Sequence, residues 1–153
     1  MNRLNEIKKY IEISPTLSSG GQPSKEQLVV LCEEGVKLVI NLGLEDADYA
    51  VEKEAEILAK YGVEYINIPV DFTSPTKKKL FQFFSAMQLL KNNKIFVHCA
   101  ANKRASCFVG LWGKFFLGWS KNEVDEYISN VWEPDQVWSS FMDKMVLEIG
   151  NHS

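Results

Sequence analysis

The sequence predicts an α/β fold in which a central, mostly parallel sheet of four or five strands has helices on both faces. Unbroken apolar runs at residues 37–42 and 94–97 are typical of strands that are covered on both sides. A helical pattern separates the first run from an alternating strand at residues 63–68, and this spacing predicts a right-handed crossover between parallel strands. With 153 residues, of which 46% are apolar, the chain has the size of one domain with a buried core, so we expect a single domain over residues 1–153.

Charge and composition exclude several classes of protein. A net charge of −3 gives no electrostatic support for a nucleic-acid partner, and no apolar run is long enough to cross a bilayer. Residues 1–9 lack the apolar segment of a signal peptide, so we expect a cytoplasmic protein. The cysteines Cys32, Cys99 and Cys107 form no C-x-x-C pair, and with two histidines in the chain we expect no metal site.

The N-terminal quarter of the chain predicts a helix, a loop and a second helix. Residues 2–11 have apolar side chains on one side of a helical pattern, which predicts a short amphipathic helix. Residues 14–24 are rich in Ser, Gly and Pro and predict a loop, with a brief edge strand near Leu17. Ser24 and Gln27 have the spacing of a capping box, so we expect a helix to begin after Ser24.

Further helical patterns flank the strand at residues 63–68. Residues 47–60 predict a helix with three inward-facing side chains, those of Val51, Ala55 and Leu58. Ser74 and Pro75 predict the start, as cap and first residue, of a helix that runs to about residue 90.

Three helices are predicted after the strand at residues 94–97. Residues 104–117 are apolar nearly all round, which is typical of a helix buried in the core. Ser120 and Glu123 form a second capping-box pattern, which predicts the start of another helix. Residues 137–149 predict a last, amphipathic helix.

The last strand and the buried helix are joined by the sequence His98-Cys99-Ala100-Ala101-Asn102-Lys103-Arg104-Ala105-Ser106. A strand end fixes the position of the cysteine. The N-terminus of the following helix has free N–H groups and about half a positive charge, which stabilise anions and thiolates. A thiolate is a nucleophile, and an arginine holds two oxygens of a tetrahedral oxyanion at once. The motif therefore predicts a nucleophile at Cys99 and an oxyanion-binding side chain at Arg104.

This motif resembles the active-site loop of the cysteine-dependent protein tyrosine phosphatases, nearest the small dual-specificity type. Upstream, Ser19-Gly20-Gly21-Gln22-Pro23-Ser24 and Val39-Ile40-Asn41-Leu42 are similar to a bacterial branch of that superfamily, the DUF442-type, beta-lactamase-hydrolase-like phosphatases. The resemblance runs from about Leu17 to about Val131. It implies a phosphotyrosine-phosphatase-like fold and the hydrolysis of phosphate monoesters without a metal or an organic cofactor.

The resemblance also implies roles for single residues. Cys99 attacks phosphorus and forms a phosphocysteine that water hydrolyses, while His98 orients the loop and helps keep the thiolate, and Ser106 donates a hydrogen bond to the leaving thiolate. Asp71 follows the strand at residues 63–68, and since the C-terminal ends of parallel strands meet at one edge, it matches the family's general acid. The residues implied to hold the phosphate are Ala100, Ala101, Asn102, Lys103, Arg104 and Ala105. The implied substrate is a phosphorylated protein or a small phosphate ester, and phosphate or sulfate is expected to bind in the loop.

The loop departs from the family pattern in its length. Four residues separate Cys99 from Arg104, one fewer than in the family, and Ala105 stands in the arginine position. Three hypotheses stay open: a phosphatase in which Arg104 still holds the oxyanion, a phosphate-binding module without turnover, and a sulfurtransferase, because rhodanese-type loops have this shorter length. Asn102 stands where dual-specificity loops often carry Gly, and Asn adopts a positive φ at little cost.

Overall fold

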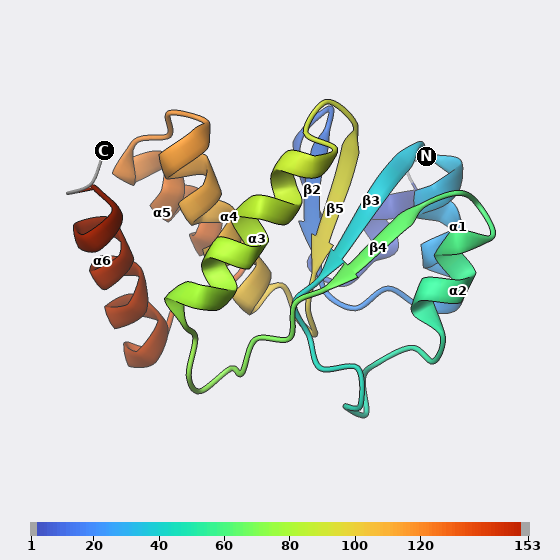
Figure 1. Ribbon diagram of the computed structural model, residues 1–153, viewed down its shortest axis with the longest axis horizontal. Coiled ribbons are helices and arrows are strands. Elements are labelled where there is room, and N and C mark those ends of the chain that lie inside the picture. Colours follow the sequence, from blue (N-terminus) through green and yellow to red (C-terminus); the bar gives the residue numbers. More distant parts are fainter. Residues whose placement is uncertain (1–2, 151–153) are drawn as a thin grey trace.

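The computed structural model describes residues 3–150 and contains a five-stranded sheet between two layers of helices (Figure 1). Its strands are β1 (Ile11–Ser14), β2 (Leu17–Gly20), β3 (Val36–Asn41), β4 (Glu64–Asn67) and β5 (Lys94–His98). Their order in the sheet is β1-β2-β5-β3-β4, where β1 runs antiparallel to β2 and all other neighbours are parallel. The predicted α/β class and the mostly parallel sheet are confirmed.

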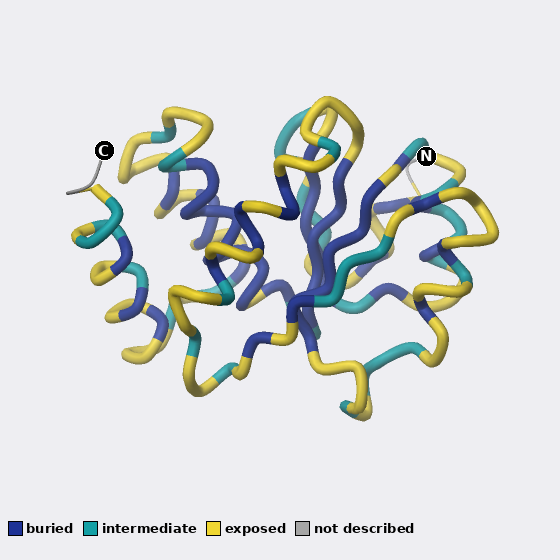
Figure 2. Tube along the Cα trace, in the orientation of Figure 1, coloured by how far each residue is buried: buried dark blue, intermediate teal, exposed yellow. Residues whose placement is uncertain are grey.

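Helices cover both faces of the sheet, as predicted. One face carries the 3-10 helix η1 (Arg3–Glu6), α1 (Lys25–Glu33) and α2 (Glu54–Ala59). The other face carries α3 (Lys77–Leu89), α4 (Lys103–Phe116), α5 (Lys121–Ser129) and α6 (Gln136–Gly150). α4 packs on β2 and β5, whereas α5 and α6 pack on α4. Figure 2 shows the result: the buried part of the chain runs through the sheet and α4.

Alternate residues of the central strands enter two separate cores. Leu38 and Ile40 of β3 belong to the core under α3 and α4, whereas Val39 belongs to the core under α1 and α2. A strand whose successive side chains point to opposite, buried faces is apolar without interruption. The continuous apolar run therefore predicted this strand correctly.

Both predicted capping boxes are present. Ser24 Oγ accepts a hydrogen bond from Gln27 N (3.1 Å), and Gln27 Oε1 accepts one from Ser24 N (2.9 Å). Ser120 and Glu123 repeat the arrangement at 3.1 and 3.0 Å. Because a capping box satisfies backbone donors at a helix start, it fixes where α1 and α5 begin.

The helix predicted over residues 2–11 is wrong over most of its length. Residue 2 lies outside the described residues, Arg3–Glu6 form a short 3-10 helix, and Ile11 begins β1. Lys9 adopts φ +53°, which is incompatible with a right-handed helix. Ile7 is still buried under α1, so the apolar residues reach the core from a turn rather than from a helix.

Over residues 14–24, the predicted strand near Leu17 is present, but its predicted position at an edge of the sheet is wrong. Leu17–Gly20 form β2, which is buried along its length and lies between β1 and β5 rather than at an edge. The small residues serve close packing here, since a Cβ added at Gly20 would lie 3.1 Å from the ring of Phe96. The Ser and Gly residues therefore mark a crowded strand.

The helix predicted over residues 47–60 is confined to Glu54–Ala59. Turns and bends occupy most of the segment before it, and Lys53 adopts φ +60°, so the helix begins late. It is also rotated relative to the prediction, because Ala55 is exposed and Glu54 is buried. The helix that follows β4, α3, also starts later in the chain than predicted.

α3 begins after Thr76 and not at Ser74 and Pro75. Thr76 Oγ1 accepts a hydrogen bond from Lys79 N (3.2 Å), which identifies Thr76 as the cap. The residues before it extend the loop that follows β4, and this loop forms one wall of the candidate site.

Candidate active site

The candidate site lies at the C-terminal edge of the sheet, near the lower centre of Figure 1. β5 ends at His98, and Cys99 follows it with only 1% of its surface exposed. The loops after β3 and β4 leave the sheet at the same edge. In open parallel sheets this edge is where ligands bind, so the topology brings the predicted nucleophile and the Asp71 loop together.

Asn102 shapes the turn from Cys99 into α4. It adopts φ +64°, which agrees with the expected positive φ, and it occupies the N-cap position of α4. Its side chain does not cap the helix; Nδ2 donates instead to Lys9 O (3.0 Å) and to Ser19 Oγ (3.1 Å). The helical hydrogen bonds of α4 begin at Ser106 N, which donates to Asn102 O (2.8 Å). The N-terminus of this 14-residue helix is therefore left uncapped by side chains, as an anion site requires.

Arg104 is turned inward from the start of α4. Its side chain is 6% exposed, and Nη1 donates to Val70 O at 2.8 Å. Nη2 lies 3.3 Å from the hydroxyl of Tyr49, which comes from the loop after β3, and the guanidinium carbon lies 6.0 Å from the ring centroid of Phe72. Arg104 thus ties α4 to the loops after β3 and β4. Ala105, in the family's arginine position, is buried in the core beside α4's other apolar residues.

Asp71 follows Val70 directly and is exposed. One carboxylate oxygen accepts hydrogen bonds from Thr73 Oγ1 and Thr73 N, both at 2.8 Å. These bonds, with a smaller contribution from the positive charge of Arg104, hold the pKa of Asp71 below its usual value. Because Arg104 binds the carbonyl next to Asp71, the two predicted side chains belong to one local structure.

Aromatic side chains from the C-terminal part of the chain hold this loop in place. Trp138 Nε1 donates to Phe72 O (2.9 Å), and the ring of Phe72 lies 5.7 Å from that of Trp132 and 6.2 Å from that of Trp138. Lys103 Nζ lies over both Phe72 (5.9 Å) and Trp132 (5.3 Å). The segment beside Asp71 is therefore anchored to α6 and to the first residue of α4.

His98 lies beneath the loop and is fully buried. Its Nε2 is 2.6 Å from Glu54 Oε2, and its Nδ1 is 3.3 Å from Cys99 O. The sequence analysis missed Glu54, Gln22 and Tyr49 as members of the site. Gln22 lies in the motif at residues 19–24 that carries the resemblance, whereas no local pattern marks Glu54 or Tyr49, because each reaches the site from a different loop or helix and through a long-range contact.

The hydroxyl of Ser106 donates its hydrogen bond to a backbone carbonyl and not to the sulfur of Cys99. Its hydroxyl donates to Lys103 O, one turn back in α4, at 2.9 Å. The predicted donation to the Cys99 thiolate therefore needs the hydroxyl to rotate away from this carbonyl. The next residue, Cys107, is buried, and burial raises the pKa of its thiol well above the usual value, so it is an inert core residue.

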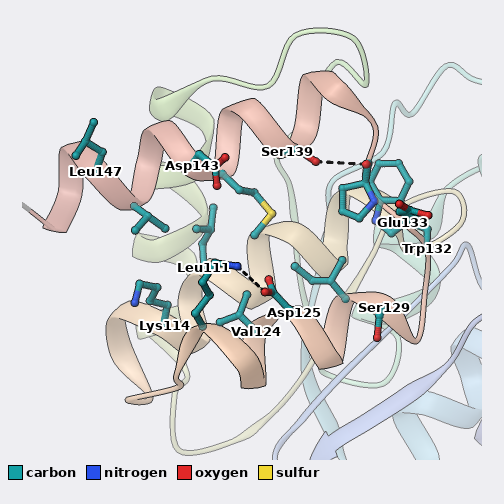
Figure 3. A pocket seen from close by; sticks show the side chains of 15 residues that line it. Leu111, Lys114, Val124, Asp125, Ser129, Trp132, Glu133, Ser139, Asp143 and Leu147 are labelled. Atoms are coloured by element: carbon teal, nitrogen blue, oxygen red, sulfur yellow. Dashed lines mark hydrogen bonds and ion pairs between the residues drawn. The ribbon is translucent and has the colours of Figure 1, made fainter.

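A separate groove lies away from these residues (Figure 3). It has a volume of about 930 Å³ and runs between α5 and α6 over Leu111 of α4, and only Trp132 at its end also contacts the candidate site. Neither Cys99 nor Arg104 lines it, so we place the chemistry at the loop and not in the groove. Within residues 3–150, no cluster of metal-binding side chains is present, and none of the helices has the length and apolarity of a membrane span.

Comparison with known proteins agrees with the fold described above. A family model, described as DSP-PTPase phosphatase fused to NAD+ kinase, matches residues 5–137. The crystal structure of a protein of the DUF442 phosphatase group from Shewanella putrefaciens CN-32 is 28% identical, covers 95% of both chains and superposes with a TM-score of 0.84. No curated protein sequence matches the chain.

More distant structures share the fold. A variant of TpbA from P. aeruginosa in complex with pTyr is 17% identical over 94% of this chain and 91% of its own, with a TM-score of 0.71. The core catalytic domain of the PP-IP phosphatase SIW14 from S. cerevisiae, in complex with citrate, is 17% identical over 95% and 94%, with a TM-score of 0.75. The resemblance found in the sequence is confirmed, and since the family model spans most of its length, the chain belongs to the DSP-PTPase family of phosphatases described as fused to NAD+ kinase.

Proposed function

We propose that this chain is a cysteine-dependent phosphatase, in which Cys99 is the nucleophile, Arg104 binds the oxyanion and Asp71 is the general acid. The observation that supports this most is the inward turn of Arg104, which joins the Asp71 loop through Val70 O beside the uncapped N-terminus of α4. An arginine facing solvent would have favoured a module without turnover. The shorter loop is compatible with this arrangement because Arg104, one residue early, still lies in the first turn of α4, after Lys103.

In the first step, the non-bridging oxygens of a phosphate monoester bind to the free amides of α4 and to the Arg104 guanidinium. The Cys99 thiolate attacks phosphorus, and the bond between phosphorus and the leaving oxygen breaks. That oxygen takes the proton from the Asp71 carboxyl group. The products are a phosphocysteine and a free alcohol or phenol.

In the second step, a water molecule attacks the phosphorus of the phosphocysteine. The Asp71 carboxylate accepts a proton from this water, and the bond between phosphorus and sulfur breaks. Cys99 leaves as a thiolate and inorganic phosphate is released. Both side chains return to their starting protonation states, so no metal or organic cofactor takes part.

For the substrate we propose a phosphorylated protein or a small phosphate ester. Phe72 and Trp132 form an aromatic surface beside the start of α4, and Lys103 lies over both rings. An aromatic leaving group stacks on such a surface, and a lysine attracts an anion to it. The pTyr complex of the related TpbA supports the same class of ligand.

Turnover of an aryl phosphate tests the proposal. We expect the purified protein to hydrolyse p-nitrophenyl phosphate, to be inhibited by vanadate, and to carry a phosphate on sulfur when the reaction is quenched in acid. Phosphate binding without any hydrolysis would instead indicate a non-catalytic module. Formation of thiocyanate from thiosulfate and cyanide, without phosphatase activity, would indicate a sulfurtransferase.

Replacing Asp71 with asparagine tests the general acid. We expect Asp71→Asn to lower kcat/KM by about 10²-fold for phenyl phosphate, because its leaving oxygen needs a proton. The loss for p-nitrophenyl phosphate is expected to be much smaller, because p-nitrophenolate leaves without one. Asp46→Asn, an exposed acid on the loop after β3, is the matched control. Equal losses for both substrates would contradict the assignment.

The pH profile gives a second test of the same residue. A general acid works only while protonated, so activity should fall as pH rises through the low pKa of Asp71. Thr73→Val removes the side-chain hydrogen bond that contributes most to lowering this pKa, so the falling limb should move to higher pH. In Asp71→Asn the limb should be absent.

A further inference from the structure

A buried pair of a glutamate and a histidine, Glu54 and His98, lies beside the loop that begins at Cys99. Glu54, the first residue of α2, is 4% exposed, and His98, the last residue of β5, is 0% exposed. Their Oε2 and Nε2 atoms are 2.6 Å apart, and Gln22 Nε2 donates to the other carboxylate oxygen at 3.0 Å. A buried carboxylate is costly unless it is paired. The residue next to this pair is Cys99.

Both ring nitrogens of His98 face oxygen acceptors. Nε2 faces the Glu54 carboxylate, and Nδ1 lies 3.3 Å from Cys99 O. A neutral imidazole has one N–H and cannot donate to both. For both contacts to be hydrogen bonds, His98 must be an imidazolium beside a carboxylate, or a protonated Glu54 must donate to Nε2 while Nδ1–H faces Cys99 O. The two arrangements hold the same number of protons and differ only in where one proton lies along the short Nε2···Oε2 contact.

The described side chains that surround Glu54 and His98 are an apolar ring and a neutral phenol, so the proton between the two residues is the main positive charge of the pair. In the described part of the chain, His98 is the ion-pair partner recorded for Glu54. Tyr65 of β4 is near Glu54, and burial, together with the Glu54 and Glu45 carboxylates, raises the pKa of its phenol, so it stays neutral. On the ring face of His98 lies Phe96, 5.7 Å away and apolar.

Gln22 joins the pair to the loop itself. Its side chain donates to Glu54, and its backbone amide donates to Ala100 O at 3.1 Å. Nδ1 of His98 meets the preceding carbonyl, that of Cys99. The carbonyls of Cys99 and Ala100 are therefore both held on the side of the loop that faces His98 and Gln22. Because the N–H of a trans peptide points away from its C=O, the N–H groups covalently bonded to these carbonyls point toward the opposite, ligand-binding side.

We propose that Glu54 is a positioning residue that keeps a proton on His98, and that His98 depends on this proton for the roles that the resemblance implies for it, namely stabilising the Cys99 thiolate and orienting the loop. The inference rests on the proposed function in taking Cys99 as the reactive thiolate. Without the carboxylate, His98 loses the group that retains its second proton, and the positive charge next to the sulfur is lost.

Alkylation of Cys99 tests the proposal without turnover. Iodoacetamide reacts with the thiolate, so its rate against pH, followed on the Cys99 peptide by mass spectrometry, reports the fraction ionised. We expect Glu54→Gln, which keeps the shape of the side chain, to slow alkylation near pH 6 about tenfold and to leave the rate at high pH unchanged. Glu56→Gln, an exposed acid of the same helix, should follow the wild-type curve. Superimposable curves for Glu54→Gln and wild type would overturn the proposal.

The protonation of His98 is measured directly in the wild-type protein, so the proposal does not depend on a variant that folds. The chain has two histidines, His98 and His152, and His98→Gln assigns their signals. In ¹⁵N-labelled protein at neutral pH, we expect both His98 nitrogens to carry or share a proton, and Glu54→Gln to show one bare nitrogen. A wild-type His98 with either nitrogen bare, Nδ1 or Nε2, would contradict the inference.

A double-mutant cycle separates positioning from a general structural effect. If Glu54 acts through His98, then Glu54→Gln combined with His98→Gln should alkylate no more slowly near pH 6 than His98→Gln alone. Additive losses would show that Glu54 acts by another route. These measurements concern a thiol and an imidazole, so they keep their meaning if the protein hydrolyses no phosphate ester. A wild-type protein without turnover, together with the expected slower alkylation of Glu54→Gln, would count against the phosphatase alone.

Discussion

Replacing Cys99 with serine is expected to lower kcat for aryl phosphates by on the order of 10⁴-fold or more. A serine hydroxyl is not ionised at neutral pH and has no general base within this loop, so it attacks phosphorus poorly. Cys99 is buried, and because serine is close to cysteine in volume it fits the same space, so the fold should persist. Steady-state hydrolysis of p-nitrophenyl phosphate, with thermal unfolding measured in parallel, checks both expectations.

The same variant separates the nucleophile from the anion site. Because the amides of α4 and Arg104 are untouched, Cys99→Ser should still bind phosphate or sulfate in a calorimetric titration. Cys32→Ser, at a half-buried site on α1, is the matched control and should keep full activity. Wild-type turnover in Cys99→Ser would mean that another group attacks phosphorus, and the proposed mechanism would be wrong.

The parts of the fold that the sequence predicted are those with local causes. The run at residues 37–42 and both capping boxes depend on neighbours a few positions away, and the structure confirms them. β2 was predicted only as a brief edge strand because its Ser and Gly residues usually favour turns, whereas the approach of Phe96 from the neighbouring strand requires a residue without a Cβ at Gly20. Only the sheet pairing reveals that constraint.

The site divides in the same way. Cys99, Asn102 and Arg104 lie within one short motif, so their types and spacing were visible in the sequence. Glu54 was not visible in this way. The helical pattern placed Ala55 on the inward face of the helix, whereas in α2 Glu54 is buried and Ala55 is exposed. Tyr49 contacts Arg104 from a loop after β3, and no periodic pattern extends through such a loop.

Replacing Arg104 with lysine is the second change with a large expected effect. We expect Arg104→Lys to lower kcat/KM by about 10³-fold, because an ammonium cannot hold Val70 O and two phosphate oxygens in the planar geometry of a guanidinium. The fold should persist, since the aliphatic part of lysine fills a similar space. Steady-state kinetics with phenyl and p-nitrophenyl phosphate measure the loss.

Arg3→Lys, at an exposed ion pair with Glu33, controls for the exchange itself and should change nothing. Moving the guanidinium to the family's position, by Arg104→Ala with Ala105→Arg, should not restore activity. The side chain of Ala105 is buried in the core under α4, so an arginine there would disrupt the packing that supports the loop. Rescue by that double change would show that an arginine at position 105 can hold the oxyanion, and wild-type kinetics for Arg104→Lys would show that the guanidinium of Arg104 is not needed; either result would contradict the role proposed for Arg104.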